Sequence, residues 1–207
     1  MGLFKRFIGQ TRKPEGFFGK LMLNAMNQGH AALSDWGLSH IEGLSPLVVA
    51  ELGCGGGRNV RELLLRYPMA KVYAVDYSAL AVCRTRAYNK PDIVKGRCRV
   101  LKASVQSLPL AASRFDFATA FETVYFWPDP AECFAEVYRI LKCGGSFLIC
   151  NESDGTDAEG LRYERIIDGM HCYTAEELET MLRTAGFAEV RIFRHESKPW
   201  LTVLAKK

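Results

Sequence analysis

A glycine-rich segment offers the clearest chemistry in the sequence. Glu51 is followed by Gly53, Gly55 and Gly57, directly after an apolar run. Glycines at such a turn let the backbone adopt positive φ angles and let a ligand approach the main chain closely. The helix expected after them offers unpaired N–H groups. A dinucleotide site would place its third glycine at position 58, where Arg58 stands. The acidic residue before the turn instead suits a ligand that carries an ammonium or sulfonium group.

The acidic residue and the alternating glycines resemble the first motif of the class I methyltransferases, which use S-adenosylmethionine. The resemblance implies that the turn, including Glu51 and Cys54, contacts the methionine part of this cofactor. It also implies that Asp76, which ends the next apolar run, binds the ribose hydroxyls, with Tyr77 beside it. A carboxylate can accept both hydroxyl protons side by side.

The third motif of that family differs in this chain. The family often has Gly-Asp-Ala before a Leu-Pro pair, and its aspartate binds the amino group of adenine. Here the pair is Leu108-Pro109, and Ser104 replaces the aspartate. The resemblance implies that the Ser104 side chain and the Val105 N–H meet the adenine ring. The segment 141–145, Leu-Lys-Cys-Gly-Gly, resembles a later signature of the family.

Methyl transfer is an in-line displacement at an activated carbon, so the protein mainly has to align the acceptor and exclude water. A base that removes a proton would assist an oxygen or nitrogen acceptor. The candidate bases are His171, Tyr125, Glu122 and His30. We prefer His171, because histidine titrates near neutral pH and this one stands beside Tyr173 in a polar stretch. Glu122 also counts among the cofactor contacts, because the resemblance directs the methyl group toward its loop.

The elements that must position these residues alternate along the chain. Seven apolar runs predict strands, and stretches with helical spacing predict helices between them. The pattern predicts an α/β fold with a doubly wound, seven-stranded, mainly parallel sheet. Only residues 196–199 separate the last two runs, which is too short for a crossover, so the last strand should be antiparallel. The predicted strands cover 47–52, 71–75, 98–103, 115–121, 146–151, 188–194 and 200–205, and the predicted helices cover 59–66, 78–88, 130–141 and 174–183.

Two segments differ from this alternation. Residues 1–43 begin basic and aromatic and continue with apolar residues at helical spacing, which predicts an N-terminal helical cap or lid. Residues 44–207 then form the predicted cofactor-binding methyltransferase domain. Residues 152–172 are polar and contain glycines, which predicts a loop or a short irregular insertion.

The composition limits the partners. The chain has 207 residues, 48% of them hydrophobic, and a net charge of only +4, so nucleic acid is not an expected partner. Its seven cysteines include no Cys-x-x-Cys pair, which predicts free thiols in the cytoplasm and no metal site. No apolar run approaches the roughly 18 residues of a membrane span. We therefore expect a small-molecule methyl acceptor, while the oligomeric state does not follow from the sequence.

Two other functions are compatible with parts of this pattern. A protein that binds S-adenosylmethionine without catalysis would carry the same cofactor motifs. A nicotinamide-dependent oxidoreductase would also use Asp76 on a ribose, but Arg58 opposes its glycine pattern. The basic, aromatic N-terminus leaves a lipid-like methyl acceptor open. Among these, the sequence favours a methyltransferase.

Overall fold

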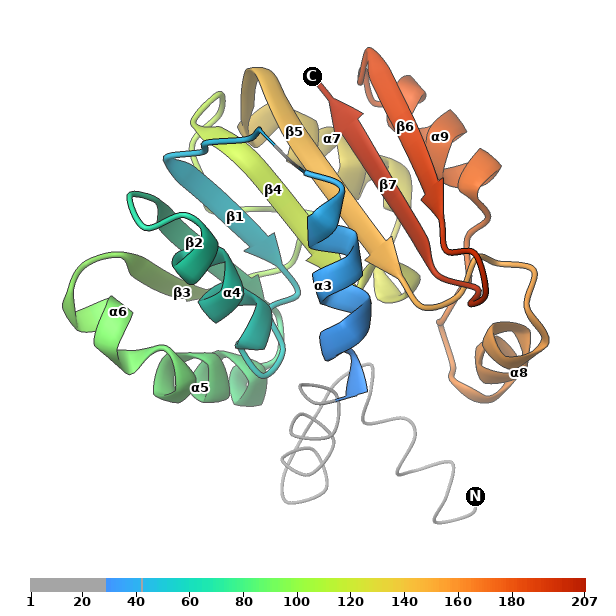
Figure 1. Cartoon of the computed structure of the whole chain (residues 1–207), viewed down its shortest axis with the longest axis horizontal. Coiled ribbons are helices and arrows are strands. Elements are labelled where there is room, and N and C mark those ends of the chain that lie inside the picture. Colours follow the sequence, from blue (N-terminus) through green and yellow to red (C-terminus); the bar gives the residue numbers. More distant parts are fainter. Residues whose placement is uncertain (1–28, 42) are drawn as a thin grey trace.

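The computed structural model describes residues 29–41 and 43–207. The strands of this part form one seven-stranded sheet in the order β3-β2-β1-β4-β5-β7-β6 (Figure 1). Strands β1 to β5 pair in parallel, whereas β7 is antiparallel to both β5 and β6. This confirms the predicted fold and the antiparallel last strand. The strands are β1 (Val48–Leu52), β2 (Lys71–Asp76), β3 (Cys98–Lys102), β4 (Phe115–Phe121), β5 (Leu141–Asn151), β6 (Glu189–Arg194) and β7 (Leu201–Lys206).

The order of the strands reverses between β1 and β4. From β1 the chain moves outward to β2 and β3, and it then returns to β4 on the other side of β1. Glu51 of β1 lies beside Thr119 of β4 in the parallel register. Ligands of open α/β sheets bind outside the carboxyl ends of the strands at such a reversal. The fold therefore directs attention to the loops that follow β1 and β4.

Helices cover both faces of the sheet, and each face has its own core (Figure 1). The cluster with α3 and α4 contains Leu33, Leu63 and Leu148, whereas the cluster with α7 and α9 contains Phe134 and Leu182. On the α3 side, the helices are α3 (Ala31–Ser39), α4 (Arg58–Arg66), α5 (Ala79–Tyr88) and the short α6 (Lys90–Val94). On the opposite face lie α7 (Pro130–Ile140) and α9 (Ala175–Thr184). None of the helices formed by residues 29–41 and 43–207 has the length and apolar character needed to cross a membrane.

Helix α8 (Ala158–Ile166) lies in the segment that we predicted as a loop or irregular insertion, so that prediction was wrong. Its N-terminus is capped by Asp157, whose Oδ1 accepts a hydrogen bond of 2.7 Å from the N–H of Gly160. Gly160 lies inside the helix at a position that has no room for a side chain. A Cβ at this position would lie 2.1 Å from Oγ of Ser153. The sequence also did not predict α6, and β5 begins five residues before its predicted start at residue 146.

The N-terminal cap is described only in its last part. Residues 1–28, which carry several of the apolar residues used to predict a helix, lie outside the described residues. Helix α3 packs closely on β5, because a Cβ at Gly37 would lie 2.6 Å from Sγ of Cys150. Leu33 and Leu38 of the same helix are buried. The described part of the cap is therefore integrated into the core, while its function as a lid stays a prediction.

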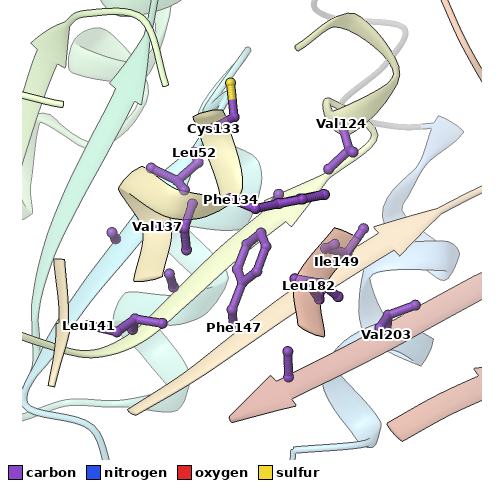
Figure 2. Packing of buried hydrophobic residues seen from close by; sticks show 14 of the residues in the cluster. Leu52, Val124, Cys133, Phe134, Val137, Leu141, Phe147, Ile149, Leu182 and Val203 are labelled. Carbon is purple, nitrogen blue, oxygen red and sulfur yellow. The ribbon is translucent and has the colours of Figure 1, made fainter. Parts of the chain in front are cut away.

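The core between β5 and the helices α7 and α9 contains aromatic residues packed together, among them Phe134 and Phe147 (Figure 2). Phe147 is fully buried, and its ring centroid lies 6.2 Å from those of Trp127, Phe134 and Phe187. We expect Phe147→Ala to lower the free energy of unfolding by about 3–5 kcal/mol, because it leaves a cavity that the sheet cannot close. Urea denaturation measures this loss. Phe147→Leu should cost clearly less, and equal losses for both variants would contradict the cavity explanation.

Candidate active site

The glycine segment forms a tight turn between β1 and α4. The N–H groups of Gly53 and Cys54 both donate to the Val75 carbonyl, at 2.8 and 3.0 Å. Gly53 has a φ of +84°, and Gly57, which precedes the first residue of α4, has a φ of +86°. A Cβ at Gly53 would lie 2.3 Å from the methyl carbon of Thr123, so the turn also packs against the loop after β4. Glycine is therefore required here by both conformation and space.

Asp76 ends β2 and holds the turn from the side. Its Oδ2 accepts a hydrogen bond of 2.9 Å from the N–H of Gly55, and its Oδ1 accepts one of 2.8 Å from the N–H of Ser78. The residue is only 8% exposed. Burial raises the pKa of this carboxyl above its ordinary value, and the two N–H donors oppose that effect. The strand end, the turn and the start of α5 are thus joined through one carboxylate.

Helix α5 and the residue that caps its C-terminus support the turn from behind, and the sequence analysis missed both contacts. Thr85 Oγ1 donates to the Gly55 carbonyl at 3.0 Å, and Asn89 Nδ2 donates to the Gly57 carbonyl at 3.0 Å. Both side chains are fully buried. They stand four residues apart, so they lie on one face of the helix. In the sequence, the signal that could have found them was two polar residues four positions apart at the end of a predicted helix.

A cleft opens in front of the turn. The loop after β4 contributes Glu122 and Thr123, and the cap contributes His30 and Ser34. Glu122 has a φ of +59°, which is uncommon for a residue with a Cβ. The cleft therefore lies at the strand reversal, where the fold predicts a ligand site. The residues that line it are His30, Ser34, Gly53, Cys54, Gly55, Gly56, Arg58, Asn59, Phe121, Glu122 and Thr123.

A family model described as a methyltransferase domain matches residues 50–149, which include the glycine turn, Asp76 and the loop after β4. Cycloartenol-C-24-methyltransferase 1 of Oryza sativa subsp. japonica is 32% identical over 108 residues, or 52% of this chain and 31% of that protein. The uncharacterized methyltransferase YdaC of Bacillus subtilis (strain 168) is 23% identical over 173 residues, covering 84% of this chain and 89% of that one. These matches support a class I S-adenosylmethionine-dependent methyltransferase domain in residues 50–149.

A solved S-adenosylmethionine-dependent methyltransferase from Mesorhizobium loti has the same fold as this chain. The TM-score is 0.69 at 20% identity, and the match covers 84% of this chain and 98% of that one. The chain spans only part of the length of some relatives. Its matches cover 31% of the Oryza sativa protein and 50% of the cycloartenol-C-24-methyltransferase of Arabidopsis thaliana.

Glu51 is a buried carboxyl under the glycine turn. It is 1% exposed, and its Oε2 accepts a hydrogen bond from the Thr119 hydroxyl. Burial raises the pKa of Glu51 to about 8, against the hydrogen bond from Thr119, which lowers it. Near neutral pH the carboxyl is therefore mostly protonated in this structure.

The raised pKa of Glu51 has a consequence for stability. The folded chain holds the proton more tightly than the unfolded chain, whose pKa is near 4.5, so this group stabilises the fold fully below pH 4.5 and loses that effect as the pH rises toward 8. We expect Glu51→Gln, which cannot ionise, to gain stability relative to the natural chain between pH 5 and pH 8, by on the order of 2 kcal/mol. Urea denaturation at both pH values measures the difference, and a difference that does not change with pH would contradict the prediction.

The segment predicted to meet adenine lies beside Asp76. The N–H of Ala103 donates to the Asp76 carbonyl at 3.0 Å, which brings the end of β3 next to the end of β2. Ser104 Oγ accepts a hydrogen bond of 3.3 Å from the N–H of Gln106, so it stabilises the local turn. Val105 is half-buried against the core, and Tyr77 is 40% exposed. The contact of these residues with a cofactor stays a prediction.

The three preferred base candidates lie in one neighbourhood but in different environments. Glu122 lines the cleft, and burial raises its pKa to about 8. The buried Tyr125 donates its hydroxyl to Glu122 Oε1 at 3.0 Å and accepts from the N–H of Ser153 at 3.0 Å. His171 is about half exposed, lies 3.2 Å from a carboxylate oxygen of Glu164, and is absent from the residues that line the cleft. Its backbone N–H reaches the Tyr125 carbonyl at 2.9 Å.

Proposed function

We propose that this methyltransferase transfers a methyl group from S-adenosylmethionine to a small-molecule acceptor. The observation that supports this best is the hydrogen bond of 2.9 Å between Gly55 N–H and Asp76 Oδ2, which joins the two cofactor motifs beside the cleft. The residues present fit the cofactor. Gly53 and Gly57 let the turn pack tightly against Thr123 and Thr85, which holds it beside the cleft, and a carboxylate lies at the next strand end.

We propose the following places for the parts of the cofactor. The methionine part lies in the cleft over the turn, with Gly53, Gly55 and Gly57 as backbone contacts, Cys54 beside them and Glu51 beneath. Asp76 accepts the ribose hydroxyls with the acceptor positions that its two N–H partners leave open. Tyr77, Ser104 and Val105 border the adenine.

In the reaction, an acceptor lone pair forms a bond to the methyl carbon while the carbon–sulfur bond breaks, and the sulfur keeps that electron pair. An oxygen or nitrogen acceptor then has to give up a proton. Of the candidate bases, Glu122 is the one that we assign to the reacting side, because it lines the cleft. Tyr125 positions it through the hydroxyl hydrogen bond. His171 is an alternative only if the acceptor reaches beyond the loop after β4.

The remaining assignments are part of the same proposal. We assign the methyltransferase domain to residues 44–207 and the cap to residues 1–43, because His30 and Ser34 of the cap line the cleft. The seven cysteines are free thiols, which suits a reducing compartment such as the cytoplasm. A non-catalytic protein that binds S-adenosylmethionine is the second candidate, because the cofactor contacts alone carry no information on turnover.

Two measurements test the function. Calorimetric titration with S-adenosylmethionine should give saturable binding, and NADH should give none; the reverse result would reject the proposal. Incubation with methyl-labelled S-adenosylmethionine and a fractionated metabolite extract should then yield a labelled small molecule. Cofactor binding without a labelled product in any fraction would favour the non-catalytic candidate.

A further inference from the structure

Three side chains that are far apart in the sequence meet at one side of the cleft. His30 immediately precedes α3, Glu122 follows β4, and Glu152 follows β5. One ligand atom of each lies within 4.8 Å of the others, and His30 Nε2 is 3.6 Å from Glu152 Oε2. We propose that these three residues bind a divalent transition-metal ion, with Mn²⁺ as the best match. The sequence analysis predicted no metal site because it searched for cysteine pairs and not for ligands from three separate elements.

The donor set indicates the class of metal. Carboxylate oxygens suit Mg²⁺, Ca²⁺ and Mn²⁺, whereas imidazole nitrogen suits transition metals such as Zn²⁺ and Fe²⁺. Mn²⁺ accepts both types of donor. One imidazole and two carboxylates also leave coordination positions open, so an ion held here could take a further oxygen ligand from a molecule in the cleft.

Glu122 is oriented by hydrogen bonds in the way that metal ligands commonly are. The Tyr125 hydroxyl donates to Glu122 Oε1 at 3.0 Å, and the N–H of Glu152 donates to the same oxygen. Tyr125 is itself held by the N–H of Ser153. Both hydrogen bonds that the described residues make to the Glu122 side chain fall on Oε1, so Oε2 is the oxygen available to an ion.

The charges of these three side chains favour the binding of a cation. Two carboxyl groups lie close together, and their mutual repulsion raises the free energy of the ionised pair. Within residues 29–41 and 43–207, no ion pair joins Glu122 or Glu152 to a lysine or arginine. Arg58 lines the same cleft but pairs with Asp35 at 2.8 Å. A divalent ion would therefore supply the positive charge that the side chains do not.

The metal site lies at the cleft of the proposed function, and the role given to the ion in the reaction rests on that proposed function. Because Glu122 borders the cleft assigned to the methyl donor, an ion beside it would hold an acceptor through an oxygen atom. A hydroxyl bound to a divalent ion loses its proton more readily than a free one, and the proton can pass to bulk water. With the ion bound, Glu122 is therefore a ligand and no longer the base. We therefore infer that the acceptor belongs to the class of small molecules with a hydroxyl group at the methylated position.

The experiment uses the full chain after treatment with EDTA. Mn²⁺ alone is added, and free Mn²⁺ is followed by electron paramagnetic resonance. We expect one site per chain, and at least a 10-fold loss of affinity in Glu152→Gln and in His30→Gln. Glu196→Gln is the matched control, because it removes the same charge from an exposed carboxylate with no ion pair in the described part of the chain, and it should bind Mn²⁺ like the natural chain. Thermal unfolding of each variant verifies that it is folded.

The outcomes separate this proposal from the proposed function. No saturable Mn²⁺ binding by the folded natural chain, or equal losses in Glu152→Gln and Glu196→Gln, would overturn the metal site. In that case S-adenosylmethionine titrated into the EDTA-treated chain would still bind if the proposed function is right. Site-specific Mn²⁺ binding without any binding of S-adenosylmethionine would keep the ion and reject the methyltransferase assignment.

Discussion

Replacing Asp76 by alanine should reduce the affinity for S-adenosylmethionine roughly 100-fold or more. Loss of two hydrogen bonds from the ribose to a charged group costs about 3 kcal/mol in total, which corresponds to a factor of that size. The same change removes the acceptors of the Gly55 and Ser78 N–H groups, so the turn also becomes less ordered. Calorimetric titration measures the dissociation constant, and Asp76→Asn should give a smaller loss because it keeps one oxygen.

Asp116 offers a matched control for this experiment. Its Oδ2 also accepts two backbone hydrogen bonds, from the N–H groups of Leu47 and Val48, but at the opposite ends of the strands. Asp116→Ala should therefore lower the free energy of unfolding while leaving the affinity for S-adenosylmethionine nearly unchanged. Unchanged affinity in Asp76→Ala, or equal loss in both variants, would remove Asp76 from the cofactor site.

Introducing a single methyl group at Gly53 should abolish detectable binding of S-adenosylmethionine. In Gly53→Ala the new Cβ would lie 2.3 Å from Cγ2 and 2.7 Å from Cβ of Thr123, so the threonine has to move. That movement breaks the hydrogen bond of 3.0 Å from Thr123 Oγ1 to the Leu52 carbonyl and shifts one wall of the cleft. The positive φ of +84° adds about 1–2 kcal/mol of backbone strain. Binding and urea denaturation are measured together.

Gly144→Ala separates the strain from the collision. Gly144 has a similar φ of +76°, but a Cβ there would have nothing within 4 Å. This variant should lose only the strain energy of about 1–2 kcal/mol and should bind the cofactor normally. If Gly53→Ala lost no more stability than Gly144→Ala and still bound S-adenosylmethionine, the contact between the turn and the loop after β4 would be unimportant.

The fold was predictable because its signals are local. The apolar runs marked the seven strands, and the short segment between the last two runs was enough to predict the antiparallel pair. Helix starts carried their caps in the sequence, as at Thr174, where Glu177 completes a capping box in the structure. Helix α8 was missed because the polar, glycine-containing stretch 152–172 was interpreted as a loop, whereas Gly160 within it allows close packing against Ser153.

The sequence predicted residues of the site only where they belong to a recognisable motif or stand next to one along the chain. The turn at Gly53 and the acidic residue at the end of β2 follow from position along the chain. The approach of His30 to Glu152 arises from a contact between distant segments, which no spacing in the sequence encodes. The preference for His171 used its position beside Tyr173, but adjacency in the chain gives no direction in space, and the ring pairs with Glu164 outside the set that lines the cleft.

The two faces of the sheet differ in what they contribute to this protein, because one borders the cleft and the other holds the aromatic core. Within residues 29–41 and 43–207, every residue that borders the cleft comes from a strand end, from the loops there or from the layer of α3 and α4, and none comes from α7 or α9. The aromatic packing around Phe134 and Phe147 lies on the other face. Side chains on the face with α7 and α9 can therefore change during evolution, and so change thermal stability, without changing the cleft. Side chains on the face with α3 and α4 can change to fit a new acceptor while the aromatic core on the other face keeps the chain folded.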